Sequence, residues 1–123
     1  MKAEQFLDNY DPSVKQLATS TRNFLLKIIP EAKEEVDIPA KMIAYGLGAG
    51  YKGMICTILL SKTGVKIGLN RGSELPDPEK LLGGTGKVHR YVQIRDEKIL
   101  KSKALKDLVA AGIKACKIRM AVK

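Results

Sequence analysis

The chain has 123 residues, of which 45% are hydrophobic and 28% are charged. This balance is typical of one globular domain, here spanning residues 1–123, and it excludes a wholly disordered chain. The net charge is +9. Most of it lies in residues 71–123, where thirteen basic and six acidic side chains give +7, against nine and seven (+2) in residues 1–70. A basic half of this kind favours anionic partners, although it also keeps a protein soluble.

Neither a membrane span nor a secretory signal is recognisable. No uncharged run approaches the roughly 18 residues that cross a bilayer, and the first residues are charged where a signal peptide would be apolar. The two cysteines, Cys56 and Cys116, lie in separate aliphatic stretches without metal-ligand spacing, which indicates small buried hydrophobes. We therefore expect a cytoplasmic protein that makes no contact with a membrane.

The first strong pattern predicts a helix over residues 11–29. Asp11 suits the N-cap and Pro12 the first helical position, where a missing N–H costs nothing. Pro30 ends the pattern, because proline cannot continue a helix. The apolar face recurs at steps of three and four residues, through Val14, Leu17, Ala18, Thr21, Leu25 and Ile28.

From residue 35 the apolar period changes to two, which predicts β-strands. Residues 35–42 alternate, with Pro39 indicating an edge, a bulge or a break. The glycine-rich residues 46–50 read as a flexible connection. Residues 54–60 read as a strand buried on both faces, and residues 65–69 as its antiparallel hairpin partner across a turn at 61–64.

The second half ends in a strand and a helix. Residues 71–87 read as a loop with one helical turn at 77–82, and residues 88–95 alternate as a last strand. Ser102 can cap a final helix whose apolar stripe is Leu105, Leu108, Val109, Gly112, Ile113 and Cys116. This order predicts an α+β fold: a two-layer sandwich with an antiparallel sheet of four or five strands, covered on one face by the N- and C-terminal helices.

Two glycine-rich segments resemble nucleotide-binding loops but lack their context. Residues 83–87 end in Gly-Lys, yet Leu81 stands where a P-loop has its first glycine, and a strand follows instead of a helix. Residues 46–50 lack the sixth-position glycine of a dinucleotide fingerprint, since Tyr51 stands there. Both segments are therefore interpreted as turns, with backbone N–H groups beside Lys87 as an alternative anion nest.

The densest group of hydrogen-bond donors surrounds the only histidine, His89. No nucleophile and base can be assembled around it, so we expect no enzymatic activity. Alternate strand positions could instead turn these donors toward one concavity, suited to an anionic or aromatic group. The predicted ligand-binding residues are Gly84, Gly86, Lys87, His89, Arg90, Tyr91 and Arg95.

Metal binding has weaker support. One histidine and two separated cysteines cannot make an ordinary zinc site. Four acids near the end of the first helix could hold a hard cation or ferric iron, or they form a solvated helix end: Glu31, Glu34, Glu35 and Asp37. No resident cofactor is predicted.

Residues 64–94 resemble the YdhG-like family, a domain of unknown function. The resemblance lies in Gly64–Leu69, in the Leu-Pro-Asp-Pro run at 75–78, and above all in the Gly-Thr-Gly-Lys-x-x-Arg segment at 84–90. It extends back to residue 34 and forward through the final helix. The resemblance implies an α+β fold with an antiparallel sheet, frataxin-like in shape, and some members are described as frataxin-like iron chaperones.

Three functions are consistent with the sequence. The first is a non-enzymatic binding domain of the YdhG-like type that takes a small anionic ligand or a partner protein through the residues around His89. The second is a frataxin-like iron chaperone that uses the four acids. The third is weak nucleic-acid binding through the lysine-rich final helix, although no nucleic-acid motif accompanies it.

Overall fold

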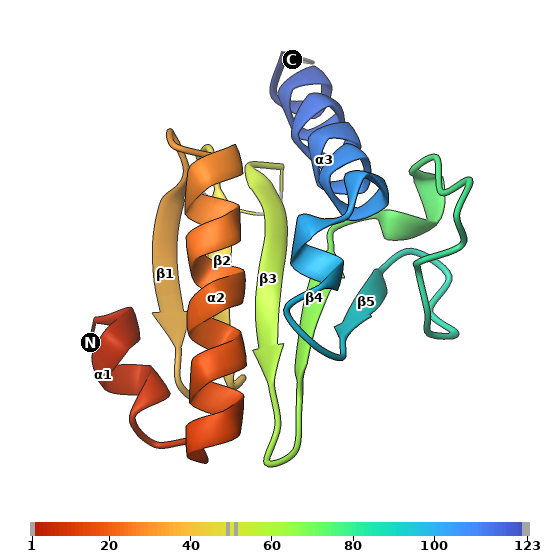
Figure 1. The fold of residues 1–123 in the computed structure, drawn as a ribbon. Helices are drawn as coiled ribbons and strands as arrows, with labels where there is room; N and C mark the ends of the chain where they lie inside the picture. Colours follow the sequence, from red (N-terminus) through yellow and green to blue (C-terminus); the bar gives the residue numbers. More distant parts are fainter. Residues whose placement is uncertain (1, 49, 51, 122–123) are drawn as a thin grey trace.

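The computed structural model describes residues 2–48, 50 and 52–121. The sheet has five antiparallel strands in sequence order, each paired with the next along the chain (Figure 1). The strands are β1 (Lys33–Asp37), β2 (Met42–Gly46), β3 (Met54–Leu60), β4 (Val65–Leu69) and β5 (Arg90–Ile94). The helices are α1 (Ala3–Leu7), α2 (Pro12–Ile28) and α3 (Lys103–Ala121), with short 3₁₀ turns η1 (Gly72–Glu74) and η2 (Ile99–Lys101).

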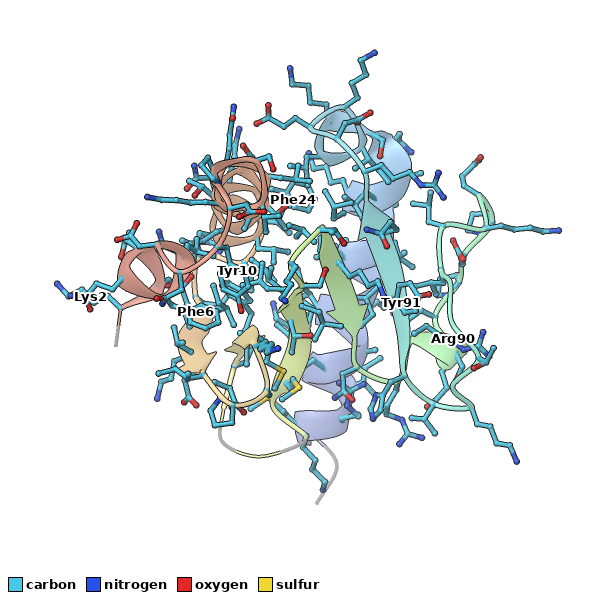
Figure 2. All side chains as sticks on the ribbon, turned by 90° about the horizontal axis from the view of Figure 1, so that it is seen from below. Lys2, Phe6, Tyr10, Phe24, Arg90 and Tyr91 are labelled. Carbon is cyan, nitrogen blue, oxygen red and sulfur yellow. The ribbon has the colours of Figure 1, made fainter. Side chains whose placement is uncertain are left out.

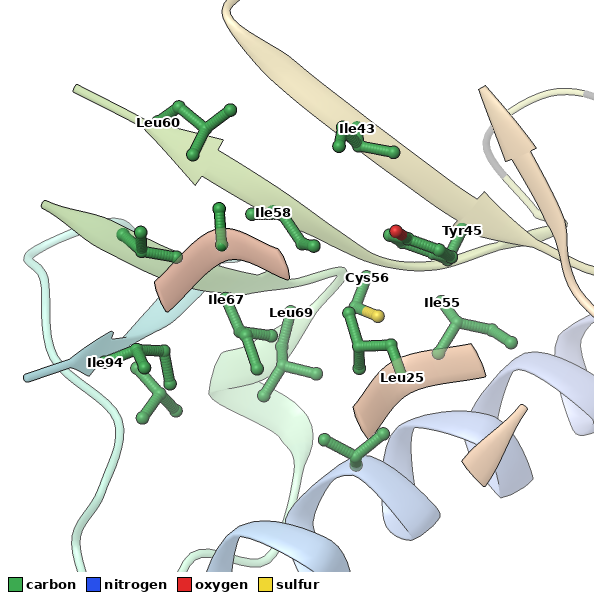
Figure 3. Packing of buried hydrophobic residues seen from close by; sticks show 14 of the residues in the cluster. Leu25, Ile43, Tyr45, Ile55, Cys56, Ile58, Leu60, Ile67, Leu69 and Ile94 are labelled. Atoms are coloured by element: carbon green, nitrogen blue, oxygen red, sulfur yellow. The ribbon is translucent and has the colours of Figure 1, made fainter. Parts of the chain in front are cut away.

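The predicted fold class is confirmed: α2 and α3 both pack on β3, on the same side of the sheet (Figures 1 and 2). We call the side beneath the helices the covered face. A row of buried side chains crosses it through paired residues of neighbouring strands, Ile43, Ile58, Ile67 and Val92. Figure 3 labels the three isoleucines of this row. Each such side chain stabilises the fold by about 1.5–3 kcal/mol. Aliphatic residues therefore supply most of the core, as the scarcity of aromatic residues requires.

Two local predictions are wrong. Residues 35–42 do not form one strand, because the chain reverses at Ile38–Lys41 between β1 and β2. The turn contains Pro39, which has no N–H for a ladder. The helical turn expected at 77–82 is absent. Instead the N–H groups of Leu81 and Leu82 donate to the Asp77 carboxylate at 2.9 Å each, which holds this segment as a compact loop.

Helix α1 was not predicted, because its five residues are too few to show a period of 3.6. The Phe6 and Leu7 side chains on its inner side are buried. The Phe6 ring contacts the Tyr10 ring edge-on, with centroids 5.5 Å apart. In α2, Pro12 begins the helix as predicted, whereas the Asp11 side chain makes no capping bond. In α3, Ser102 Oγ accepts from the Leu105 N–H at 3.3 Å and so caps the helix as predicted.

Candidate functional site: the uncovered face of the sheet

The opposite side of the sheet, away from the helices, we call the uncovered face. Strand alternation places two rows of side chains on it. One row runs through Ala44, Thr57, Gly68 and Tyr91, and the next through Met42, Leu59, Lys66 and Gln93. Every residue in these rows except Thr57 is partly exposed. An antiparallel sheet commonly leaves one face to solvent, and here that face carries several side chains with long carbon chains.

A hollow of about 390 Å³ lies in this face over β3, β4 and the start of β5. Its lining is mostly carbon. Gly68 forms part of the floor, and a Cβ there would lie only 2.7 Å from Thr57 Oγ1 and 3.2 Å from Leu59 Cδ1. The Thr57 and Leu59 side chains therefore occupy the space that a larger residue would need. The lining residues are Met42, Met54, Thr57, Leu59, Gly68, Leu69, Asn70, His89, Arg90 and Tyr91.

Tyr91 supplies the aromatic wall of the hollow, and contacts to its ring and to its backbone restrain it. Lys66 Nζ lies 4.4 Å from the ring centroid, which is a cation–π contact. The backbone at Gly83 exchanges two hydrogen bonds with Tyr91, of 2.7 and 3.3 Å. Gly84 has φ +98°, and a Cβ there would lie 2.8 Å from Tyr91 Cε2. The glycine pair thus lets the chain run directly against the ring.

Arg90 belongs to the same strand but is engaged within its own chain. Its Nε donates to the Gly86 carbonyl at 2.5 Å, and Nη1 donates to the Gly84 carbonyl at 3.4 Å. Figure 2 shows Arg90 and Tyr91 on β5, at the edge of the sheet that is farthest from α1. The guanidinium therefore fixes the glycine segment beside Tyr91, which is a positioning role.

His89 lies at the rim of the hollow, directly before β5. Its Nδ1 accepts the Arg71 N–H at 3.3 Å. Arg71 in turn forms an ion pair with Glu74 at 2.5 Å. The segment after β4 therefore sets the orientation of the histidine.

The structure gathers only part of the predicted ligand-binding set. His89, Arg90 and Tyr91 line one hollow, and Gly84 and Gly86 are bonded to Arg90 beside it. Lys87 and Arg95 are exposed and do not line the hollow. Lys87 contributes through its backbone, because its carbonyl accepts the Ser73 hydroxyl at 2.8 Å.

The acids proposed for iron are split between the two faces. Glu34 faces the helices, where it accepts hydrogen bonds from Arg22 Nε at 2.8 Å, Arg22 Nη2 at 2.9 Å and Tyr45 Oη at 2.6 Å. Register places Glu35 and Asp37 on the uncovered face, while Glu31 lies in the turn after α2. Among the described residues no group of three or more His, Cys, Asp or Glu side chains is placed to hold a metal ion.

The three groups around Glu34 have perturbed pKa values. Burial acts to raise the pKa of Glu34, but the hydrogen bonds from Arg22 and Tyr45 outweigh it and leave the pKa below its usual value. Burial, together with the Glu34 hydrogen bond, raises the pKa of Tyr45. The Glu34 hydrogen bond also raises the pKa of Arg22. The ionised Glu34 carboxylate and the Arg22 guanidinium therefore form a structural ion pair between β1 and α2.

Both thiols are buried and reduced. Burial raises the pKa of Cys56 to about 12 and also raises the pKa of Cys116. Thiols in this state are poor nucleophiles and poor metal ligands at neutral pH. They act as core residues, in line with the sequence interpretation.

Several lining residues were not predicted from the sequence. Residues 54–60 read as buried on both faces, so Met54, Thr57 and Leu59 were not expected to line an open hollow. Gly68, inside a strand, was the available signal, since a glycine there often marks a close approach. Lys66 gave no signal in the sequence, because its contact with Tyr91 depends on the pairing of β4 with β5.

Comparison of the chain with family models, with curated proteins and with solved structures gives no match. In the described part of the chain, no helix combines the length and the apolar character that crossing a bilayer requires.

Proposed function

We propose that the protein is a non-enzymatic, cytoplasmic binding domain of the YdhG-like type, and that the hollow on the uncovered face takes a small ligand with a flat apolar body and an anionic group. The observation that carries this proposal is the lining of the hollow: carbon atoms and one aromatic ring, with cationic side chains beside them. Pockets for small molecules combine these features, a largely apolar wall with few polar groups.

Lys66 is the side chain best placed to receive the anionic group. It is half-buried beside the hollow and lies over Tyr91, so its position is restrained. Within the described residues no carboxylate forms an ion pair with it. His89 lies at the rim of the hollow. An anion bound at Lys66 would leave its apolar part against Tyr91 and Leu59.

The test uses three probes that separate the two parts of the ligand: phenyl phosphate, inorganic phosphate and phenol. Amide shifts of ¹⁵N-labelled protein are followed during titration with each. We expect saturable shifts at Thr57, Gly68 and Tyr91 with phenyl phosphate, and weaker binding of both fragments. Affinity should be modest, in the millimolar to high micromolar range, because an open hollow encloses little of its ligand.

Two variants make the test specific to this face. Leu59→Arg fills the hollow and should abolish the phenyl phosphate shifts. Thr63→Arg adds the same charge in the exposed β3–β4 turn and should leave them unchanged. Equal shifts in wild type and Leu59→Arg, or binding of inorganic phosphate as tight as that of phenyl phosphate, would refute the proposed site.

A further inference from the structure

Helix α3 carries a buried stripe of residues and a second, more exposed stripe, of which Ile113 is partly buried and also packs against the core. The core stripe consists of Leu105, Leu108, Val109, Gly112 and Cys116, all buried. The second stripe repeats at steps of three and four along the exposed part of the helix. Its residues are Ala110, Ile113, Lys114, Lys117, Ile118 and Ala121, and we call them the α3 groove.

The α3 groove is a shallow depression of about 510 Å³ with a mostly carbon lining. Ile118 is 58% exposed, the largest exposure among the large hydrophobic side chains of the described chain. In Figure 1 the C-terminal end of α3 lies beyond the ends of the strands. The groove therefore presents apolar side chains at an accessible end of the molecule.

The charge of the groove is positive and unbalanced. Asp107 is the only acid in α3, and Lys103 Nζ already pairs with it at 3.1 Å. No carboxylate in the described residues forms an ion pair with Lys114 or Lys117. At 100° per residue these two lysines lie between Ile113 and Ile118. An occupant must therefore offer both apolar contacts and negative charge.

We propose that the α3 groove binds an acidic amphipathic α-helix of another protein. Steps of three and four residues are the pattern by which one helix packs against another. The small Ala110 and Ala121 permit close approach at both ends. A second copy of this chain does not fit, because self-packing would place Lys114 and Lys117 against the same lysines. Bare phosphates would leave the isoleucines uncovered. This proposal is independent of the ligand hollow, which lies on another surface.

The probe is an 18-residue synthetic helix with leucines at steps of three and four and glutamates on either side. Its binding to the full chain is measured by fluorescence anisotropy, beside a scrambled peptide of identical composition. We expect the amphipathic peptide to bind at least tenfold more tightly than the scrambled one, because only the former presents its leucines and glutamates on one face.

Matched lysine variants locate the site. Lys117→Glu lies in the groove and should weaken binding about fivefold or more, whereas Lys62→Glu, which makes the same charge change in the exposed β3–β4 turn, should change binding less than twofold. Ile118→Ser should also weaken binding without affecting the fold, since the side chain is exposed. Equal binding of both peptides, or equal losses in the two lysine variants, would overturn the proposal. Tighter binding to duplex DNA or to phosphatidylglycerol vesicles than to the peptide, lost in Ile118→Ser, would overturn it too.

Discussion

The two faces of the sheet use adjacent residues of the same strands for different purposes. On the covered face, Ile43, Ile58 and Ile67 are fully buried beneath α2 and α3. On the uncovered face, the neighbouring Met42, Leu59 and Lys66 remain partly open to solvent. Strand alternation alone separates these two sets. The difference teaches that stability is concentrated on one face, so the side chains of the other face can line a solvent-accessible hollow.

The largest expected effect tests this division on adjacent residues of β3. Ile58→Ala should lower the free energy of unfolding by about 3 kcal/mol, because it leaves a cavity in a closed core. Leu59→Ala should lower it by about 1 kcal/mol, because that side chain is only partly removed from water. Urea unfolding of both variants measures the pair. Equal losses would show that the uncovered face is buried in solution, for example by self-association.

A second test concerns the Glu34 cluster, which joins Glu34, Arg22 and Tyr45 on the covered face. The pKa of Glu34 is lowered in the folded protein, so between its usual value near 4.5 and its lower folded value the unfolded chain binds more protons. Folding is therefore supported by this group above about pH 4.5, and that support is lost as the pH falls through the folded pKa. Glu34→Gln should cost about 1–2 kcal/mol at pH 7 and much less at pH 3.

The control for this test is Glu35→Gln, one residue along β1 and on the uncovered face. It should change the free energy of unfolding by less than about 0.5 kcal/mol at pH 7. The two variants are compared by urea unfolding at pH 7 and pH 3. A Glu34→Gln loss that stays constant across this range would contradict the assignment of the carboxylate as the group that titrates.

The smallest expected effect lies on the uncovered face. Lys66→Ala removes the cation over Tyr91 and should cost about 0.5–1 kcal/mol of stability, yet it should remove most of the affinity for phenyl phosphate. Thermal unfolding and amide-shift titration of the same variant measure the two quantities. A large loss of stability with unchanged affinity would assign Lys66 to folding and not to binding.

Much of the fold follows from local patterns. The apolar steps of three and four in α2 and α3, and the period of two in β4 and β5, predicted these elements and the side of each that faces the core. Proline effects were harder to predict in detail. Pro39 indicated a disturbance in residues 35–42, but only the pairing of β1 with β2 shows that the disturbance is a reversal of the chain.

The candidate site was predicted in part. His89, Arg90 and Tyr91 are adjacent in sequence, so their common location required only one strand. Arg90 was expected to bind a ligand, yet its guanidinium is bonded to the Gly84 and Gly86 carbonyls. Every residue has a backbone carbonyl, so the sequence does not show which carbonyl will accept a hydrogen bond from Arg90. Thr57, Gly68 and Lys66 joined the site only through strand pairing, which connects residues far apart in the chain.

The amino-acid order by itself determined α2, α3, most strands and the layer they form, because these depend on periodicity and on a few residues with restricted backbones. Only the tertiary structure decided which groups within the chain contact one another: Glu34 with Arg22 and Tyr45, Lys66 with Tyr91, and Arg90 with the glycine segment. Such contacts depend on distances between elements, and local spacing carries no information about those distances.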